Sequence, residues 1–488
     1  MNSEIRTLQP KLLWNKFADL NAIPRPSKKE EKVIAFMMAF GEKLGLNTIS
    51  DEVGNVIIKK PATAGMENRK AIVLQSHLDM VHQKNSDTVF DFLTQGIEMY
   101  VDGDWVRAKG TTLGADNGLG VATIMAILES NDIEHPAIEA LFTIDEEAGM
   151  GGAFGLQAGV LEGEILLNLD TEDDDEIDIG CAGGINVTAI SEYEEEEVPQ
   201  NVTAFKITVK GLNGGHSGMD IHRGLGNANK IMNRLFFDGF ENFGLRICEV
   251  NGGGLRNAIP RESFATVVVD NTHREAFKFE FNELAETIKN ELNTTEPNLI
   301  IIAEVTNKPK KVMALAAQIE ITKAIYAAQN GVYRMSAHME DLVETSNNIA
   351  KVEINSGHIK VSCLTRSSVE SSKMDLANSL RATFELAGCE VEFSGSYPGW
   401  NPNVGSPILQ VLSSKYEDLF GEKANIVACH AGLECGILGQ NYPEMDMISF
   451  GPTIKGAHSP DERVSISSVQ KFWKFTLEIL KNIPFKNS

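Results

Sequence analysis

The sequence predicts an α/β protein in which a mostly parallel central sheet, flanked by helices, is interrupted by an inserted α+β domain. Three observations lead to this prediction. Helical and strand patterns alternate over residues 1–186, and the charged run SEYEEEEVPQ at 191–200 ends that pattern. Acidic and imidazole side chains suited to one metal site stand near both ends of the chain. At 488 residues the chain also exceeds what one compact core usually holds.

The first segment alternates the two kinds of element. We expect amphipathic helices over 10–21 and 28–45, apolar strands at 71–75, 138–144 and 164–169, and a helix over about 118–130 after a Gly-rich turn. Strands separated by helices favour a parallel sheet. The polar residues that end these strands should then collect at one edge of the sheet.

The middle segment has a different order of elements. After the acidic run we expect strands at 205–212, 262–270 and 298–305, with helices over 225–237 and 275–292. A related order returns as a strand at 359–365, a helix over 372–387 and a strand at 389–395. Internal duplication of a β-α-β-β-type unit and an unrelated succession of elements both stay open.

Composition excludes several classes of protein. The 68 acidic residues outnumber the 44 Lys and Arg, which gives a formal charge of −24. Such a surface repels phosphate backbones, so neither nucleic acid nor an anionic membrane is an expected partner. The six cysteines form no CxxC pair, the first residues lack a signal-peptide pattern, and no apolar run approaches the roughly 18 residues of a membrane span. We therefore expect a cytoplasmic protein with reduced thiols.

Five isolated side chains stand where an apolar run meets a polar or Gly-rich turn: His77, Asp116, Glu147, Asp170 and His458. Two imidazoles and three carboxylates suit Zn²⁺ or a similar divalent ion. A single tetrahedral zinc needs only four ligands, whereas two metals sharing one carboxylate use all five. Such a site favours hydrolysis.

The position of His458 has a consequence for the domains. If His458 joins ligands from the first 170 residues, then 1–186 and 397–488 form one metal-binding domain, and 187–396 is an insertion. Taken singly, the candidates also have ordinary interpretations. His77 and Asp79 fit a surface pair, Asp116 fits a helix cap, and Glu146 with Glu147 fits two solvated acids at a strand end.

Two neighbours of the candidates fit supporting roles. Glu146 adjoins Glu147, so one carboxylate can hold a metal while the other acts on water as a general base. Asp79 lies two residues after His77 on a strand-like segment, on the same face, where a carboxylate fixes the tautomer of a metal-bound imidazole.

Six motifs together carry a family resemblance. SHLDMV, GTTLGADNG, DEEAGMGG, LNLDTE, GGHSGMD and GAHSPDE occur in the order found in the dizinc exopeptidases related to carboxypeptidase G and aminoacylase, which this chain resembles over essentially its whole length. The length, the large insert and the forms GADNGLG and HAGLECG are most similar to the aminoacyl-histidine dipeptidases of that family.

The resemblance implies a role for each residue. Asp116 would bridge two zinc ions, His77 and Asp170 would complete one metal, and Glu147 and His458 the other. Glu146 would be the general base, and Asp79 the partner of His77. In the insert, which would serve as a lid, His216 would stabilise the oxyanion.

Substrate contacts are implied less directly. Asn257, Arg366 and Gly432 are the candidates, with Arg366 set to bind a C-terminal carboxylate. From the residues alone, His216 equally fits the cap of a Gly-rich turn, and Arg366 fits a surface arginine better. The chain also departs from many relatives, since His430-Ala-Gly-Leu-Glu434 stands where they carry a GGTD-like motif.

The resemblance further implies an activity. We expect a metal-dependent dipeptidase that hydrolyses short unblocked peptides, including Xaa-His dipeptides such as carnosine, with two divalent ions, Zn²⁺ first and Mn²⁺ or Co²⁺ as alternatives. A homodimer is the expected assembly. An N-acyl amino acid deacylase with the same metal pair is one alternative. A non-catalytic metal-dependent binding protein is another, which the presence of Glu146 argues against.

Overall fold

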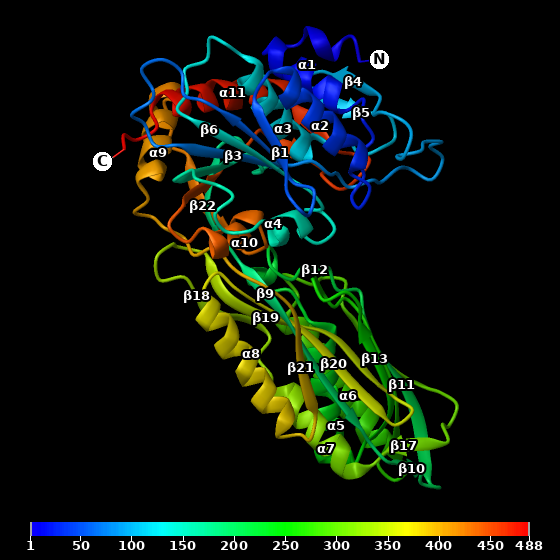
Figure 1. The fold of residues 1–488 in the computed structure, drawn as a ribbon. Helices are drawn as coiled ribbons and strands as arrows, with labels where there is room; N and C mark the ends of the chain where they lie inside the picture. Colours follow the sequence, from blue (N-terminus) through cyan, green and yellow to red (C-terminus); the bar gives the residue numbers. More distant parts are fainter. Residues whose placement is uncertain (1, 487–488) are drawn as a thin grey trace. The chain divides into compact units, whose positions relative to one another are not determined.

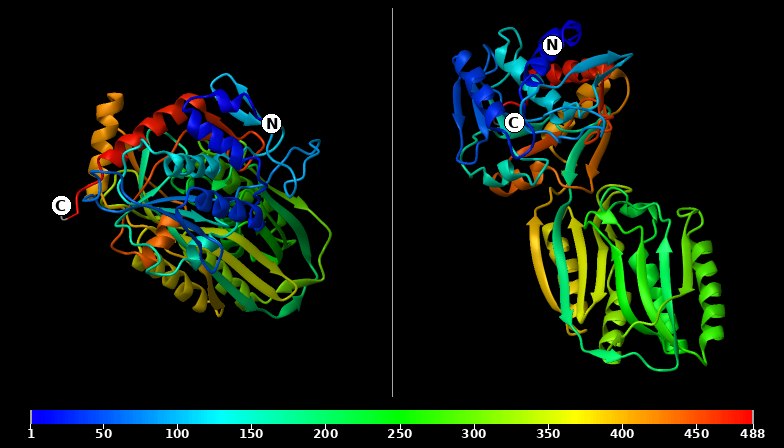
Figure 2. Two further views of the ribbon diagram at one scale, coloured as in Figure 1. Left: turned by 45° about the horizontal axis from the view of Figure 1, so that its top comes forward. Right: turned by 90° about the vertical axis from the view of Figure 1, so that its right-hand side faces the viewer.

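The computed structural model of the protein describes residues 2–486, which form two compact units (Figures 1 and 2). The first unit comprises the chain up to Gly180, the segment Pro402–Ala428 and the chain from Leu433 onward. The second unit comprises Cys181–Asn401 and the short segment Cys429–Gly432. The predicted fold class, a mostly parallel sheet with helices plus an inserted α+β part, is confirmed.

An eight-stranded sheet forms the centre of the first unit. Its order is β1-β2-β6-β3-β7-β23-β8-β22, and the four central strands β6, β3, β7 and β23 run parallel. The strands span Asn47–Ser50 (β1), Val56–Lys60 (β2), Ile72–His77 (β3), Ile138–Thr143 (β6), Ile165–Asn168 (β7), Glu176–Cys181 (β8), Asn425–Cys429 (β22) and Asp446–Ser449 (β23). Every residue of β3, β6 and β7 is buried, as expected for parallel strands covered on both faces.

Helices and a small second sheet complete this unit. The helices are α1 (Lys11–Leu20), α2 (Glu31–Lys43), α3 (Ala115–Glu129), α4 (Gly151–Gly155), α9 (Pro407–Phe420), α10 (Glu434–Asn441) and α11 (Ile466–Lys481). The strands β24 (Ile454–Lys455), β25 (Arg463–Ser465), β5 (Trp105–Ala108) and β4 (Met99–Asp102) form a four-stranded sheet. Trp14 and Phe17 of α1, Leu119 of α3 and Val469 of α11 share one apolar core. Residues from the two ends of the chain therefore stabilise the same unit.

The start of α3 differs from the prediction. The helix begins at Ala115 rather than near residue 118, because Gly114 takes a left-handed conformation with φ 68° that turns the chain into the helix. Asp116 and Asn117 depart from helical geometry within its first turn. This irregular turn carries the candidate ligand Asp116.

The second unit is built on a nine-stranded antiparallel sheet. Its order is β16-β11-β15-β13-β19-β20-β9-β21, with β18 added beside β19. The strands span Gly183–Glu192 (β9), Val202–Lys210 (β11), Arg246–Gly253 (β13), Ser263–Asp270 (β15), Ile300–Val305 (β16), Gly331–Met335 (β18), Val343–Asn355 (β19), His358–Ser367 (β20) and Glu390–Tyr397 (β21). Two short pairs, β10 (Glu195–Glu197) with β17 (Lys311–Met313) and β12 (Gly215–His216) with β14 (Ala258–Ile259), flank it.

Four helices lie against one face of this sheet in Figure 1: α5 (Ala228–Phe243), α6 (Arg274–Glu291), α7 (Leu315–Ala327) and α8 (Glu370–Glu385). Phe205, Ile207 and Val209, at every second position of β11, join the apolar core beneath them. The helix α5 lies later than the predicted 225–237, because Asn227 accepts the amide hydrogens of Asn229 and Lys230 and so caps its start.

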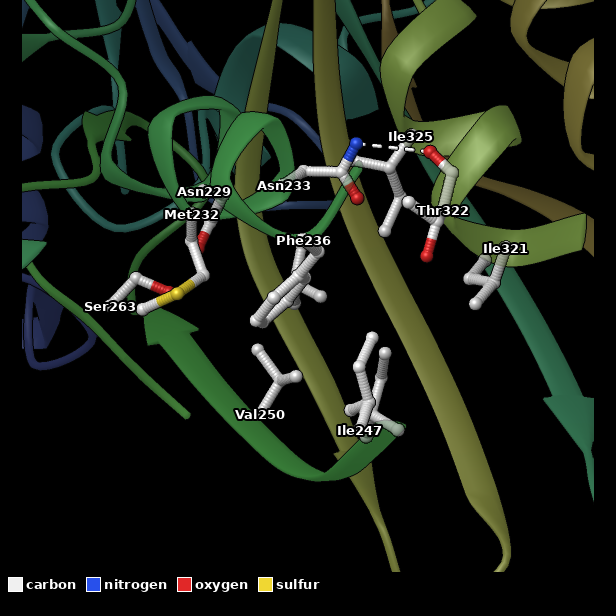
Figure 3. Close-up of a pocket in the computed structure, with 12 residues that line it drawn as sticks. Asn229, Met232, Asn233, Phe236, Ile247, Val250, Ser263, Ile321, Thr322 and Ile325 are labelled. Atoms are coloured by element: carbon white, nitrogen blue, oxygen red, sulfur yellow. Dashed lines mark hydrogen bonds between the residues drawn. The ribbon is translucent and has the colours of Figure 1, made fainter. Parts of the chain in front are cut away.

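The interior of the second unit leaves no room for a substrate between α5, α7 and β13. The cavity there has a volume of about 10 Å³. Met232, Phe236 and Ile247 are among the side chains that line it (Figure 3). A space of this size holds at most one water molecule. Among the residues described, no helix is both long and apolar enough to span a bilayer.

Candidate metal centre

The candidate ligands of the first unit come from the ends of neighbouring strands. His77 is the last residue of β3, Asp170 lies two residues after β7, and Glu147 follows β6 in a turn. Because β6, β3 and β7 are adjacent and parallel, their carboxyl ends meet at one sheet edge. Asp116 enters from the irregular start of α3, and His458 from the segment after β24.

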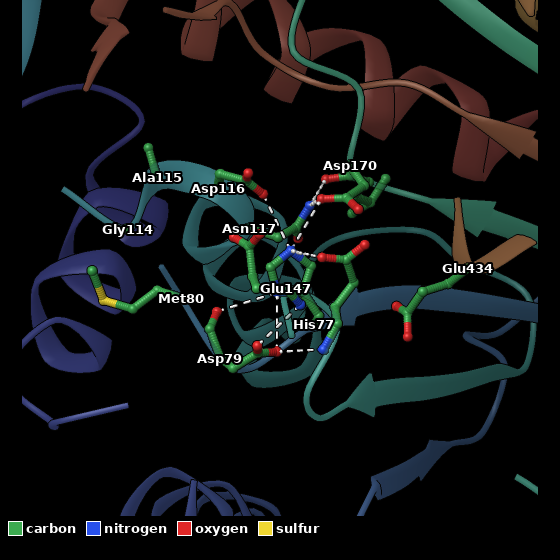
Figure 4. Close-up of polar contacts among 12 residues, drawn as sticks. His77, Asp79, Met80, Gly114, Ala115, Asp116, Asn117, Glu147, Asp170 and Glu434 are labelled. Carbon is green, nitrogen blue, oxygen red and sulfur yellow. Dashed lines mark hydrogen bonds and ion pairs between the residues drawn. The ribbon is translucent and has the colours of Figure 1, made fainter. Parts of the chain in front are cut away.

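The two imidazoles face the same carboxylate. His77 Nε2 lies 3.2 Å from Asp116 Oδ1 and 3.5 Å from Asp170 Oδ1 (Figure 4). His458 Nε2 lies 3.3 Å from Asp116 Oδ2 and 3.1 Å from Glu147 Oε2. Asp116 therefore turns one oxygen to each imidazole, as a bridging carboxylate does.

The residues present fit a pair of divalent cations. Within the described chain, three overlapping groups each bring ligand atoms within 4.8 Å of one another: His77 with Asp116 and Asp170, His77 with Glu146 and Glu147, and Asp116 with Glu147 and His458. Glu147 Oε1 is buried without a hydrogen-bond partner. Hydrogen bonds that His458 donates to Asp116 and Glu147 raise the pKa of its imidazole to about 11, so these carboxylates favour a positive charge beside them. Nitrogen and oxygen donors around excess negative charge are what Zn²⁺ and similar ions require.

Glu146 differs from its neighbours in its environment. Its Oε2 lies 4.0 Å from His77 Nε2. Burial raises the pKa of Glu146 well above its usual range, and Asp170, Glu434 and Glu147 add to the rise. A raised pKa makes the carboxylate of Glu146 a stronger base, which suits general acid–base work.

Asp79 contacts both the imidazole and the acidic turn. Its Oδ1 lies 3.4 Å from His77 Nδ1 and accepts the amide hydrogen of Glu146 at 3.0 Å. Its Oδ2 accepts the amide hydrogen of Glu147 at 3.2 Å. The sequence indicated the first contact and missed the other two, since nothing local shows that the turn after β6 folds over β3.

A row of buried polar side chains behind the ligands was also missed. Thr143, Gln75, Asn168 and Ser449 come from the adjacent strands β6, β3, β7 and β23, and each is hydrogen-bonded to the next. Glu434 Oε2 accepts from Gln75 and Thr143 at one end of the row. Gln75 and Asn168 precede His77 and Asp170 by two residues, so polar residues at alternate positions of apolar strands were the available signal.

A second polar cluster lies within the second unit. Arg366 is only 4% exposed, so the prediction of a surface arginine is wrong. Its Nη1 donates to Tyr397 Oη at 2.8 Å, its Nη2 lies 3.4 Å from His216 Nε2, and its Nε is 3.5 Å from Ser217 Oγ. β20, which carries Arg366, buries the guanidinium beside neutral partners, an arrangement suited to an anionic ligand.

The remaining candidates also belong to the second unit. The carbonyl of Asn257 accepts the amide hydrogen of Ser217 at 2.8 Å, so Asn257 lies beside the His216 turn. Gly432 ends the segment Cys429–Gly432, which is held where the amide of Ala182 donates to the carbonyls of Cys429 and Ala431. His216, Asn257, Arg366 and Gly432 thus lie in one unit, and the candidate metal ligands in the other.

Comparison with known proteins identifies the family. The sequence profile of Peptidase family M20/M25/M40 matches residues 73–482. The chain belongs to this family. The resemblance to this family of exopeptidases and the predicted enzyme class are therefore confirmed: the protein is a family M20/M25/M40 peptidase.

Similar proteins cover the whole length of this family M20/M25/M40 peptidase. The cytosol non-specific dipeptidase of Escherichia coli (strain K12) is 46% identical over 484 residues, which are 99% of this chain and 100% of that protein. The crystal structure of aminoacylhistidine dipeptidase from Vibrio alginolyticus is 47% identical, with a TM-score of 0.95 over 99% of each chain. Aminopeptidase PepT from Bacillus cereus, 16% identical with a TM-score of 0.58 over 98% of this chain and 99% of that one, shares the fold.

Proposed function

We propose that the protein is a cytoplasmic dipeptidase that hydrolyses short unblocked peptides, including Xaa-His dipeptides such as carnosine. The observation that carries the proposal is the cluster of two imidazoles and four carboxylates in which Glu146 lies beside the candidate ligands. Full-length similarity to a cytosol non-specific dipeptidase and to an aminoacylhistidine dipeptidase supports the substrate class and the compartment.

The proposed ligand assignment follows the distances. His77 and Asp170 hold one ion, Glu147 and His458 hold the other, and Asp116 is shared, because each of its oxygens faces one imidazole. Zn²⁺ is the proposed ion, with Mn²⁺ or Co²⁺ as alternatives for the same ligands. Bound divalent ions supply Lewis-acid chemistry, which acidifies water and polarises a peptide carbonyl.

Glu146 is the proposed proton carrier. Its carboxylate accepts a proton from the attacking water and then delivers that proton to the leaving amine. Asp79 keeps this carboxylate in place by accepting the amide hydrogen of Glu146, and it orients His77 through Nδ1. His216, through a ring nitrogen, is proposed to stabilise the oxyanion.

The second unit is proposed to bind the rest of the substrate. We propose that residues 187–396, which fall within the second unit, are an inserted lid domain. The buried Arg366 is proposed to bind the substrate's C-terminal carboxylate. Asn257 is proposed to contact the substrate, and Gly432 to offer its own backbone groups to the substrate. A homodimer is the proposed assembly.

A turnover assay tests the proposal against its alternatives. Carnosine, other Xaa-His dipeptides and N-acetyl amino acids would be compared with and without a metal chelator. Chelator-sensitive hydrolysis of the dipeptides alone is expected. Preferential cleavage of the N-acetyl amino acids would favour a deacylase, and no hydrolysis of either class would favour a metal-dependent binding protein.

A further inference from the structure

Glu462, to which the motifs and the proposed function assign no role, is buried beneath the loop that carries Asp116. Its Oε2 accepts the amide hydrogens of Leu113 and Gly114 at 2.6 and 2.9 Å. Its Oε1 accepts those of Ala115 and Asp116 at 2.7 and 3.2 Å. The residue is only 2% exposed, so one carboxylate satisfies four consecutive backbone donors away from bulk water.

These four hydrogen bonds determine the conformation of the loop. Successive amides converge on one anion where right-handed and left-handed backbone conformations alternate, and Gly114 is left-handed with φ 68°. A buried amide left without an acceptor is costly, so the peptide planes from Leu113 to Asp116 cannot rotate freely. By holding these backbone amides, Glu462 therefore fixes the direction in which the Asp116 side chain leaves the loop.

Arg25 holds the same loop through the carbonyl group of Gly114. Its guanidinium, 1% exposed, donates through Nη2 to Gly114 O at 2.5 Å and through Nη1 to Leu78 O and Asp79 O, each at 3.0 Å. A Cβ atom at Gly114 would lie 2.5 Å from Arg25 Nη2. Arg25 thus links the Asp116 loop to the chain that leaves His77.

Glu462 also belongs to the turn that carries His458. The amide of Glu462 donates to Ser459 O at 3.0 Å, which closes the turn. At one end of this turn His458 Nε2 faces Asp116 Oδ2 at 3.3 Å, and at the other end Glu462 holds the amide of Asp116. A stretch of five residues therefore sets the separation between Asp116 and His458.

We propose that Glu462 is a positioning residue for the metal centre, and that Arg25 completes a charged clamp on the Leu113–Asp116 loop. The clamp fixes Asp116 relative to both His77 and His458 before any ion binds. Metal affinity then depends on Glu462, although this residue is not proposed as a ligand. The inference rests on the proposed ligand role of Asp116.

Metal titration of the Glu462→Gln variant tests the inference. Gln keeps the shape but turns a donor toward two of the four amides. Calorimetric titration of the metal-free full-length protein with Zn²⁺, and the visible spectrum with Co²⁺, should show roughly 10–100-fold weaker binding and an altered Co²⁺ spectrum, the usual effect of removing a residue that orients ligands.

Glu139→Gln is the matched control. Glu139 is also a buried glutamate of the first unit, but it accepts the amides of Glu162 and Gly163, at 2.7 and 2.8 Å, and pairs with Lys59 rather than with a ligand loop. It should lose stability and keep wild-type metal affinity. Equal affinities for the Glu462→Gln and Glu139→Gln variants would overturn the inference.

Two further results keep the test decisive. If Glu462→Gln does not fold, Arg25→Lys serves in its place, since Lys keeps the charge but cannot span the three carbonyls; unchanged metal affinity in that variant would overturn the clamp. If the wild-type protein binds no pair of metal ions, the proposed metal site itself fails. That result is distinct from wild-type binding that the variants leave unchanged.

Discussion

Gln75 Nε2 donates a 2.6 Å hydrogen bond to Glu434 Oε2, although 359 positions separate the two residues. Gln75 also contacts Thr143 on one neighbouring strand and Asn168 on the other. All four side chains are buried. The polar row therefore ties adjacent parallel strands together two residues before the candidate ligands His77 and Asp170.

Gln75→Leu should destabilise the first unit. Leu has a similar volume, but it leaves Asn168 Nδ2 without the Gln75 acceptor and takes from Glu434 Oε2 one of its two donors, Thr143 being the one that stays. A buried polar atom that loses its partner costs about 1–3 kcal/mol. Urea denaturation measures the loss, with the exposed Gln440→Leu as control in the same unit. Equal unfolding free energies for the two variants would show that the row adds nothing to stability.

Glu146→Gln should separate metal binding from turnover. The proposed base is lost while the proposed ligands stay, so we expect kcat to fall by about 10²–10⁴-fold with metal content unchanged. Steady-state kinetics and elemental analysis of the purified protein make the comparison. Loss of metal in this variant would identify Glu146 as a ligand instead, and full activity would remove it from the base role.

Arg366→Met should abolish the preference for a free C-terminal carboxylate. A charged hydrogen bond contributes about 1.5–3 kcal/mol, so kcat/KM for a dipeptide should fall roughly 10–100-fold. The same dipeptide with a C-terminal amide lacks the charge and should be almost unaffected. Equal losses on both substrates would indicate that Arg366 maintains the His216 and Tyr397 cluster rather than binding the carboxylate.

Removing metal should lower stability as well as activity. The carboxylates around His77 and His458 repel one another when no cation is bound. An ion present at 100 times its dissociation constant adds about 2.7 kcal/mol to the free energy of unfolding. Thermal melting with chelator, and again after Zn²⁺ is restored, should show a fall and a recovery; an unchanged melting temperature would contradict a filled site.

His430 should make the second unit sensitive to acid. Burial lowers the pKa of His430 to about 3, with Arg366 adding to the shift, and its Nε2 lies 2.8 Å from Ser346 Oγ. The unfolded imidazole titrates near pH 6.5, so below that pH only the unfolded state gains a proton, and stability falls until the pH reaches the folded pKa. Acidification from pH 7.5 to 5.0 should therefore lower the free energy of unfolding by about 2 kcal/mol through His430 alone.

Denaturation of the His430→Gln variant at pH 7.5 and 5.0 tests whether His430 causes this loss of stability on acidification. The variant should be less stable at pH 7.5, because its packing and its contact with Ser346 change, yet it should lose about 2 kcal/mol less than wild type on acidification. An equal loss in both proteins would assign the acid sensitivity to other groups.

Much of the fold could be predicted from local pattern. Apolar runs alternating with amphipathic segments indicated β3, β6 and β7 and the helices around them, because burial on both faces of a parallel sheet demands such strands. His77, Asp116, Glu147, Asp170 and His458 were recognisable as a set, because two imidazoles and three carboxylates at strand ends and turns suit a pair of divalent ions. The start of α3 was misplaced, because the left-handed Gly114 has no periodicity to reveal it.

The sequence by itself determined the central strands β3, β6 and β7, the chemistry of the candidate ligands and their order along the chain, since these follow from the properties of each residue and its near neighbours. Only the tertiary structure decided which distant groups meet: Glu462 with the amides before Asp116, Gln75 with Glu434, and Arg366 with His216. The reason is physical. A buried charge or amide must find its partner wherever the folded chain brings one, and neither composition nor spacing encodes that meeting.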